Sequence, residues 1–144
     1  MRKGFTLIEL LIVLAIIGVL MGIGVPMYST QLTKAKARAV AANLKTIAQT
    51  LANEVVLGNE EASGTISDIS KFVKGLDPND YKAYVEVDSA AGTADVYAGY
   101  KGSVDTSAIE DDLVGCDATD VADDMNDNTV KIGCAIKNVP VLGF

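Results

Sequence analysis

The chain has 144 residues, a length that suits one domain plus a single anchor segment and leaves no room for a second catalytic domain. Its net charge of −7 is unevenly distributed, because residues 1–52 hold six basic and one acidic side chain whereas residues 53–144 hold six basic and eighteen acidic ones. The acidic part lacks the clustered basic residues of a nucleic-acid-binding surface. The sequence contains no His, which excludes Ser-His-Asp and Cys-His nucleophiles; we expect no enzyme and no cofactor.

The N-terminal stretch is a candidate membrane span. No charged side chain occurs from Leu10 to Tyr28, and at 1.5 Å per residue these residues form a helix of roughly 28 Å, about the hydrocarbon thickness of a bilayer. Arg2 and Lys3 precede this span and should keep the N-terminus cytoplasmic, so that the rest of the chain is exported. Glu9 lies one turn into the apolar run, where an unpaired carboxylate costs on the order of several kcal/mol. A partner must therefore neutralise Glu9.

The order of these features resembles the prepilin signature of type IV pilins and the related pseudopilins of secretion systems. The resemblance covers about the first 30 residues and rests on the basic leader, the Gly4-Phe5 junction, Glu9 and the long apolar run. It implies that a membrane-embedded prepilin peptidase cuts between Gly4 and Phe5, and that the new amine of Phe5 is N-methylated. It also implies that the Glu9 carboxylate pairs with the N-terminal ammonium of a neighbouring subunit during assembly. An uncleaved signal anchor is the alternative, but an anchor does not require this signature.

The predicted helix contains one weak segment. Gly18, Gly22 and Gly24 each weaken it by up to about 1 kcal/mol relative to Ala, and Pro26 removes a backbone hydrogen bond. In filaments of similar pilins the corresponding stretch is extended. The resemblance therefore implies that this segment is helical in the membrane and partly melted in the fibre, the alternative being a simple kink at Pro26.

Beyond Pro26 we expect the helix to resume as an amphipathic segment, so that one helix runs from about Thr6 to Leu57. Basic side chains on this segment form a stripe that could meet acidic head residues of a neighbouring subunit, the alternative being a solvated face. The stripe consists of Lys34, Arg38 and Lys45. The apolar face, with spacings of three and four residues, consists of Val40, Leu44, Ile47, Leu51 and Val55.

The rest of the chain predicts an α+β head. Gly58 should end the long helix, and residues 59–64 form a polar loop. Alternation with period two predicts strands, of which the first two form a hairpin. The strands are expected over 81–88, 94–100 and 130–137, short helices over 67–76 and 106–114, and an apolar tail that packs on the head or on a neighbour over 139–144. The fold is thus a long N-terminal helix packed against a small antiparallel sheet, as the resemblance to pilins also implies.

The region around the two cysteines is the remaining candidate site. Cys116 and Cys134 are the only cysteines, and in an exported domain a disulfide between them is the simplest interpretation. The acidic loop 117–128 lies between them. An EF-hand is excluded, because Thr129 stands where the turn glycine is required; an irregular calcium site is the alternative to a solvated loop, which we prefer. The candidate calcium ligands are Asp123, Asp124, Asn126 and Asn128.

Together these features predict a leader over 1–4, a transmembrane and filament-core helix over 5–28, an amphipathic helix of the head over 29–57, and a globular α+β head with a C-terminal disulfide loop over 58–144. The resemblance implies a non-enzymatic major subunit of a type IV pilus. Such a subunit is held in the inner membrane by one span with its head outside, and the pilus assembly machinery then polymerises it into an extracellular helical homopolymer that serves motility, adhesion or DNA uptake.

Two alternatives stay open. The major pseudopilin of a type II secretion system would share every N-terminal feature of the chain. A minor pilin that acts as an adhesin or DNA receptor should carry a basic or aromatic patch, which the sequence does not show, and we expect no direct nucleic-acid partner.

Overall fold

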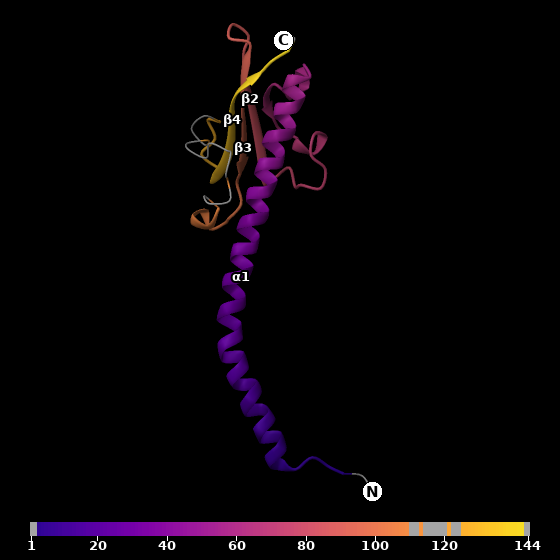
Figure 1. The fold of residues 1–144 in the computed structure, drawn as a ribbon, viewed down its shortest axis with the longest axis vertical. Coiled ribbons are helices and arrows are strands. Elements are labelled where there is room, and N and C mark those ends of the chain that lie inside the picture. Colours follow the sequence, from indigo (N-terminus) through magenta and orange to yellow (C-terminus); the bar gives the residue numbers. More distant parts are fainter. Residues whose placement is uncertain (1–2, 110–112, 114–120, 122–124, 143–144) are drawn as a thin grey trace. The chain divides into compact units, whose positions relative to one another are not determined.

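A computed structural model describes residues 3–109, 113, 121 and 125–142 of the chain (Figure 1). The chain divides into two compact units, Met1–Ala35 and Lys36–Phe144. In the first unit the residues from Leu7 onward are helical. The second unit, here called the head, contains the C-terminal half of the same helix together with the sheet.

Helix α1 spans Leu7–Val56, close to the bounds expected from the sequence. It continues through Pro26, whose carbonyl oxygen accepts hydrogen bonds from the hydroxyls of Ser29, at 2.9 Å, and Thr30, at 3.2 Å. Such bonds from side chain to backbone are known to bend helices. The stretch from Gly18 to Pro26 is helical in the single subunit. Its melting in a fibre stays a prediction.

Gly58 ends the helix, as predicted. Its φ of +76° lies in the left-handed region, where a side chain is disfavoured. The amide of Gly58 donates to the carbonyl of Val55 and the amide of Asn59 donates to that of Glu54, both at 3.0 Å. This pair of bonds is the Schellman motif, which satisfies the last carbonyls of a helix.

The head contains a four-stranded antiparallel sheet in the order β1-β2-β3-β4 (Figure 1). β2 and β3 form the hairpin expected from the alternating pattern, in a register that pairs Tyr81 with Tyr100 and Asp88 with Thr93. With α1, this sheet confirms the α+β fold class. The strands are β1 (Gly64–Ile66), β2 (Tyr81–Asp88), β3 (Thr93–Tyr100) and β4 (Ile132–Pro140).

The short helix predicted over 67–76 is wrong. The structure has a single 3₁₀ turn there, Ile69–Lys71. Asp68 caps this turn, because its carboxylate accepts the backbone N–H of Ser70 at 3.0 Å. Gly75 then takes a positive φ of +88°, so the chain turns before a second helical turn can form.

Two other loops differ in detail from the prediction. The loop predicted over 59–64 contains the 3₁₀ turn Glu60–Ala62 and runs into β1, which is too short for an alternating pattern to reveal it. The helix predicted over 106–114 begins as a 3₁₀ turn, Thr106–Ala108, and residues 110–112 and 114 lie outside the described residues.

β4 lies further along the chain than the predicted strand over 130–137. A turn in which the amide of Val130 donates to the carbonyl of Asp127 at 3.1 Å delays its start. At its far end the carboxylate of Asp95 accepts the backbone N–H of Asn138 at 2.8 Å, beside a register shift between β3 and β4. Pro140 is tolerated at the end of the strand because β4 is an edge of the described sheet and Pro needs no ladder donor there.

The two faces of the sheet are covered by different parts of the chain. The apolar face of α1 packs on one of them: Leu44 and Ile47 are fully buried in a cluster with Val85 and Val96. Every residue predicted for that helical face is buried. On the opposite face, a smaller cluster brings Val121 against strands β3 and β4. β3 is therefore buried on both faces from Val96 to Tyr100. The smaller cluster consists of Tyr97, Val121 and Ala135, with Tyr84 and Met125 packed against it.

Substitution of Leu44 by Ala should destabilise the head by about 2–5 kcal/mol, because Leu44 is fully buried and its truncation leaves a cavity. The matched control is Leu57→Ala. Leu57 is 79 % exposed, so its truncation should change the free energy of unfolding by less than about 0.5 kcal/mol. Chemical denaturation of the full chain in detergent measures both values, and equal losses would contradict the packing described.

Candidate functional site

The N-terminal part of α1 exposes apolar side chains on all sides. Every large apolar side chain from Phe5 to Leu32 is at least 42 % exposed. By length and composition α1 contains a stretch that can cross a membrane. A helix that is apolar all round needs an apolar environment, because its surface is strongly disfavoured in water. Lipid or other helices must cover this surface, since no described residue of the chain does so.

The start of α1 is a capping box. The backbone N–H and the hydroxyl of Thr6 both donate to Oε2 of Glu9 at 2.9 Å. In return, the backbone N–H of Glu9 donates to the hydroxyl oxygen of Thr6 at 3.4 Å. The box satisfies helix N–H groups that lack a partner in the first turn. Both bonds from Thr6 go to one carboxylate oxygen, and Oε1 accepts none from the described residues. Glu9 is thus held in place with one oxygen open.

Thr6 belongs to the candidate site through its contacts with Glu9, although the sequence analysis gave it no role of its own. Its signal was the Thr-x-x-Glu spacing from Thr6 to Glu9, which is characteristic of a capping box. Phe5, the residue before it, is 90 % exposed. The structure thus places Phe5, Thr6 and Glu9 next to one another at the beginning of the helix. The proposed cleavage and methylation are not tested by this arrangement.

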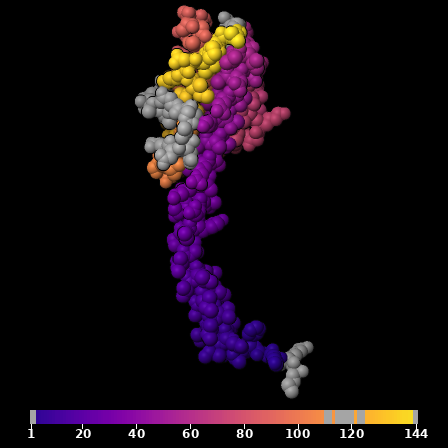
Figure 2. All heavy atoms as spheres, viewed as in Figure 1, coloured from indigo at the N-terminus to yellow at the C-terminus, as the bar shows by residue number. Residues whose placement is uncertain are grey.

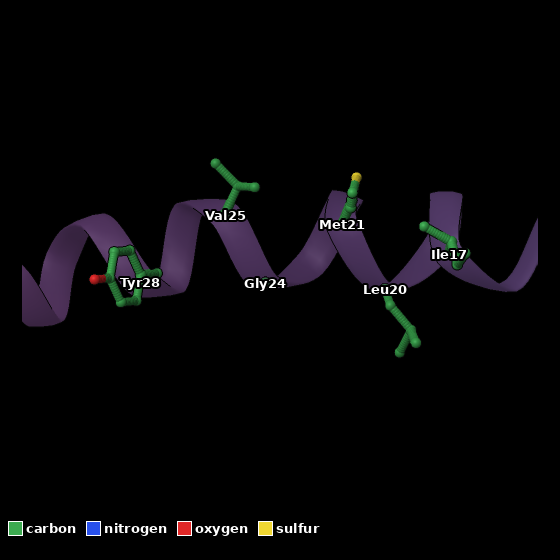
Figure 3. Close-up of a pocket in the computed structure, with 6 residues that line it drawn as sticks. All are labelled: Ile17, Leu20, Met21, Gly24, Val25 and Tyr28. Carbon is green, nitrogen blue, oxygen red and sulfur yellow. The ribbon is translucent and has the colours of Figure 1, made fainter. Parts of the chain in front are cut away.

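A shallow apolar hollow lies on α1 around Gly24. Gly24 carries no side chain, and a β-carbon placed there would meet nothing within 4 Å. In Figure 3 the neighbouring side chains stand out from the helix while the surface at Gly24 is bare. Small residues of this kind let another helix approach closely. The hollow is lined by Ile17, Leu20, Met21, Gly24, Val25 and Tyr28.

The three residues of the predicted basic stripe differ in exposure and in their contacts within the chain. Lys34 and Arg38 are exposed, and Lys45 is half-buried. Arg38 and Lys45 each already take part in an interaction within the chain. Lys36, which the prediction left out, donates from Nζ to the backbone carbonyl of Ser103 at 2.9 Å and so ties a loop of the head to α1. An intersubunit role for the stripe stays a prediction.

The cysteine region is only partly described. Cys134 is fully buried on β4 opposite Ala98 and is disulfide-bonded. Cys116 lies outside the described residues, so its pairing with Cys134 stays a prediction.

Only part of the calcium candidate can be placed. Asp123 and Asp124 lie outside the described residues, and Asn126 and Asn128 are exposed. Among the residues that are described, no group of three or more His, Cys, Asp or Glu side chains could hold a metal ion. The calcium candidate therefore stays untested.

An ion pair attaches Asp127, near the end of the acidic loop 117–128, to the sheet. Nζ of Lys82, on β2, donates to Oδ2 of Asp127, and the Asp127 carboxylate also accepts the backbone N–H of Thr129 at 2.9 Å. The hydrogen bond from Lys82, followed by those from Thr129, holds the pKa of Asp127 well below its usual range. The Asp-x-Thr spacing indicates the local turn, but no sequence pattern indicates the pairing with Lys82.

Comparisons with known proteins agree with the N-terminal motif and extend beyond it. A profile of the prokaryotic N-terminal methylation motif matches residues 1–25. The chain is similar to the type IV major fimbrial protein FimA of Dichelobacter nodosus, with 32% identity over 157 aligned positions that cover 91% of this chain and 96% of FimA. A fimbrial protein of Pseudomonas aeruginosa is 36% identical over 105 positions, 67% of either chain. The fimbrial protein EcpB of Eikenella corrodens is 57% identical over 35 positions, 24% of this chain and 22% of EcpB. No solved structure matches the chain.

Removal of the Thr6 hydroxyl should loosen the first turn of α1. Thr6→Val keeps the backbone donor to Glu9 but loses the cap, which contributes about 0.5–2 kcal/mol. The matched control Thr6→Ser keeps the hydroxyl and should behave as the unaltered chain. Amide hydrogen exchange of the residues after Thr6, measured by NMR in detergent micelles, should be faster in the Val variant alone. Equal exchange in both variants would show that the hydroxyl does not cap the helix.

Acid should weaken the attachment of the loop through Asp127. Because the pKa of Asp127 is lowered in the folded state, its stabilisation is complete above the ordinary Asp value of 3.8 and is lost as the pH falls below that value towards the folded-state pKa. In Asp127→Asn the free energy of unfolding should fall less steeply over this acid range. The matched control is Asp77→Asn, at an exposed turn, in which the free energy of unfolding should fall as steeply as in the unaltered chain. The measurement is denaturant unfolding at a series of pH values.

Proposed function

This chain belongs to the type IV pilin family, and from that premise we propose that it is the major structural subunit of a type IV pilus. The observation that carries the proposal is the N-terminal part of α1, whose large apolar side chains are exposed on every side. A subunit can cover such a helix in only two ways, with lipid before assembly and with the helices of sister subunits afterwards. The motif at its beginning and the length of the FimA match support the pilus role.

The proposed maturation begins at the Gly4-Phe5 junction. A prepilin peptidase removes residues 1–4, and the freed amine of Phe5 is methylated. The match to the N-terminal methylation motif over residues 1–25 supports this step. The cut leaves the mature chain with Phe5 directly before the capping box of Thr6 and Glu9, so the new ammonium lies one turn from the carboxylate on each chain.

Glu9 then makes assembly conditional on a correctly placed neighbour. Its carboxylate is held by Thr6 through Oε2, and its Oε1 can accept the N-terminal ammonium of another subunit. A carboxylate without that partner is costly in an apolar environment. Pairing in trans removes the cost and fixes the register of two adjacent helices. The pairing favours a subunit whose leader has been removed, because an uncleaved chain has no ammonium at Phe5.

Sister helices pack around the apolar part of α1 in the proposed fibre. The hollow at Gly24 offers a point of close approach for a neighbouring helix. The glycines and Pro26 also make this stretch the least costly one to extend. We therefore keep the proposal that Gly18 to Pro26 is helical in the membrane and partly melted in the fibre.

In this proposal the subunit waits in the inner membrane with its head outside and moves into an extracellular filament. The role is non-enzymatic, and the partners are other copies of the chain, the prepilin peptidase and the pilus assembly machinery. The major pseudopilin of a type II secretion system is the second candidate, because its N-terminal features would be the same. The names of the FimA and Pseudomonas relatives, both fimbrial proteins, favour the pilus.

Mass spectrometry of protein sheared from the outside of intact cells tests the proposal. We expect this chain to dominate the sheared material and its N-terminal peptide to begin at a methylated Phe5. If the chain is cut before Phe5 but stays in the membrane fraction, the proposal of a pilus subunit is wrong and the chain is instead a pseudopilin. If Met1 is retained, the processing proposal is wrong and the protein is a signal-anchored domain.

A further inference from the structure

Three segments of the head meet at one end of it: the end of α1, the turn between β2 and β3, and the residues that follow β4 (Figure 1). A β-carbon at Gly58 would lie 3.2 Å from the carbonyl oxygen of Leu142, and the amide of Val141 donates to the carbonyl of Gly92 at 3.0 Å. Figure 2 shows the hairpin turn, the end of β4 and the end of α1 gathered there. We call the exposed side chains of Leu57, Ala90, Ala91 and Leu142 the end surface.

The end surface is apolar at its centre. Leu57 is 79 % exposed and Leu142 is 73 % exposed. They are the two exposed large apolar side chains among the described residues of the head. Exposed leucines that lie singly on a surface need no explanation, but these two lie on chain segments that touch at Gly58 and Leu142, and neighbouring exposed apolar side chains are typical of a surface that binds a partner.

The segments that meet at the end surface are acidic, and we call their acidic side chains its rim. Residues 53–61, 86–92 and 139–142 contain five acidic side chains and no basic one. An apolar centre with a charged rim is the usual composition of a protein interface, and the rim selects a partner of opposite charge. The rim acids are Glu54, Glu60, Glu61, Glu86 and Asp88.

We propose that the end surface binds residues 32–39 of a second copy of this chain, the basic segment. This inference rests on the proposed function and identifies the contact that stacks one head on the next subunit. The basic segment contains Lys34, Lys36 and Arg38 and no acidic residue. It also carries an exposed apolar side chain, Leu32, at 59 % exposure. Its composition is thus the complement of the end surface in both charge and apolar content.

The two surfaces are different from each other, which determines the kind of assembly. Each copy carries one end surface and one basic segment, so a bound copy still offers its own free surface to the next. Contacts of this head-to-tail kind do not pair off into a closed dimer and produce an open fibre when the rotation does not close. Lys34 makes no hydrogen bond or ion pair with any described residue, so its charge is available to the acidic rim.

A photo-crosslinking amino acid in place of Leu57 tests the contact in cells that shed filaments of the altered chain. Leu57 is exposed and its substitution leaves the core intact. We expect crosslinked pairs of this chain in the sheared fraction, with the second copy attached within residues 32–39. Attachment to another part of the second copy, to a different protein or to nothing, in filaments that do form, would overturn the inference and leave the proposed function standing. Absence of filaments from the unaltered chain would instead overturn the proposed function.

A charge exchange gives an independent readout. Lys34→Glu alone, or Glu60→Lys with Glu61→Lys, should lower the yield of sheared filaments by roughly tenfold, which corresponds to a loss of about 1.4 kcal/mol per contact. The chain that carries all three substitutions should recover most of that yield. Lys74→Glu is the matched control, because Lys74 is exposed outside both surfaces, and it should assemble normally. The amount of processed subunit in the membrane shows that each variant folds. Unchanged yields in the reversals, or no recovery in the exchange, would refute the contact.

Discussion

The need to cover one apolar helix surface constrains everything else in this protein. Each fully buried Val, Leu, Ile, Phe or Met side chain contributes roughly 1.5–3 kcal/mol, and the N-terminal part of the chain, from Phe5 to Leu32, presents more than a dozen such side chains. That total exceeds the whole stability of an ordinary small domain, about 5–15 kcal/mol. The free energy of covering this helix therefore outweighs the stability of the head, and it determines which environment the chain can occupy. In the proposed pilus subunit, lipid covers this helix until the helices of other subunits replace it.

The same helix also builds the head, because its character changes along its length. From Ala37 to Val55 the buried residues of α1 follow one face, and that face supplies one side of the main core. The sheet supplies most of the rest, and Val121 and Met125 pack against its outer side. The ion pair between Lys82 and Asp127 attaches this outer layer to β2. β3 is thus protected from solvent on both faces from Val96 to Tyr100.

The helix, its apolar face and the hairpin could be predicted from the sequence because each follows from a period in neighbouring residues. The strands predicted over 81–88 and 94–100 have the expected register, and Gly58 ends α1 through a left-handed residue. β1 could not be predicted, since three residues show no period and its pairing with β2 is a long-range contact. The position of β4 depends on a bond between the Asp95 side chain and the Asn138 amide, which no local pattern reveals.

The candidate site divides in the same way. The motif from Gly4 to Glu9 is a run of neighbouring residues and could be recognised. The hydrogen bond from Thr6 to Glu9 is indicated by the Thr-x-x-Glu spacing of a capping box. The end surface could not be predicted from the sequence, because the end of α1 at Gly58 and the residues after β4 come together only when the sheet has formed. These segments are far apart in the sequence, so only the topology of the head brings them together.

The burial of α1 along the length of the head also determines how the head responds to force. In the proposed filament, tension reaches the head through α1, along the axis of the helix that packs on the sheet. Such a pull loads the packed side chains from Ala37 to Val55 together, in shear, instead of peeling them apart one after another. Interdigitated side chains resist sliding as a group, since interiors are packed as densely as crystals. The head is therefore mechanically strong along the axis of α1, the direction in which the proposed filament loads it.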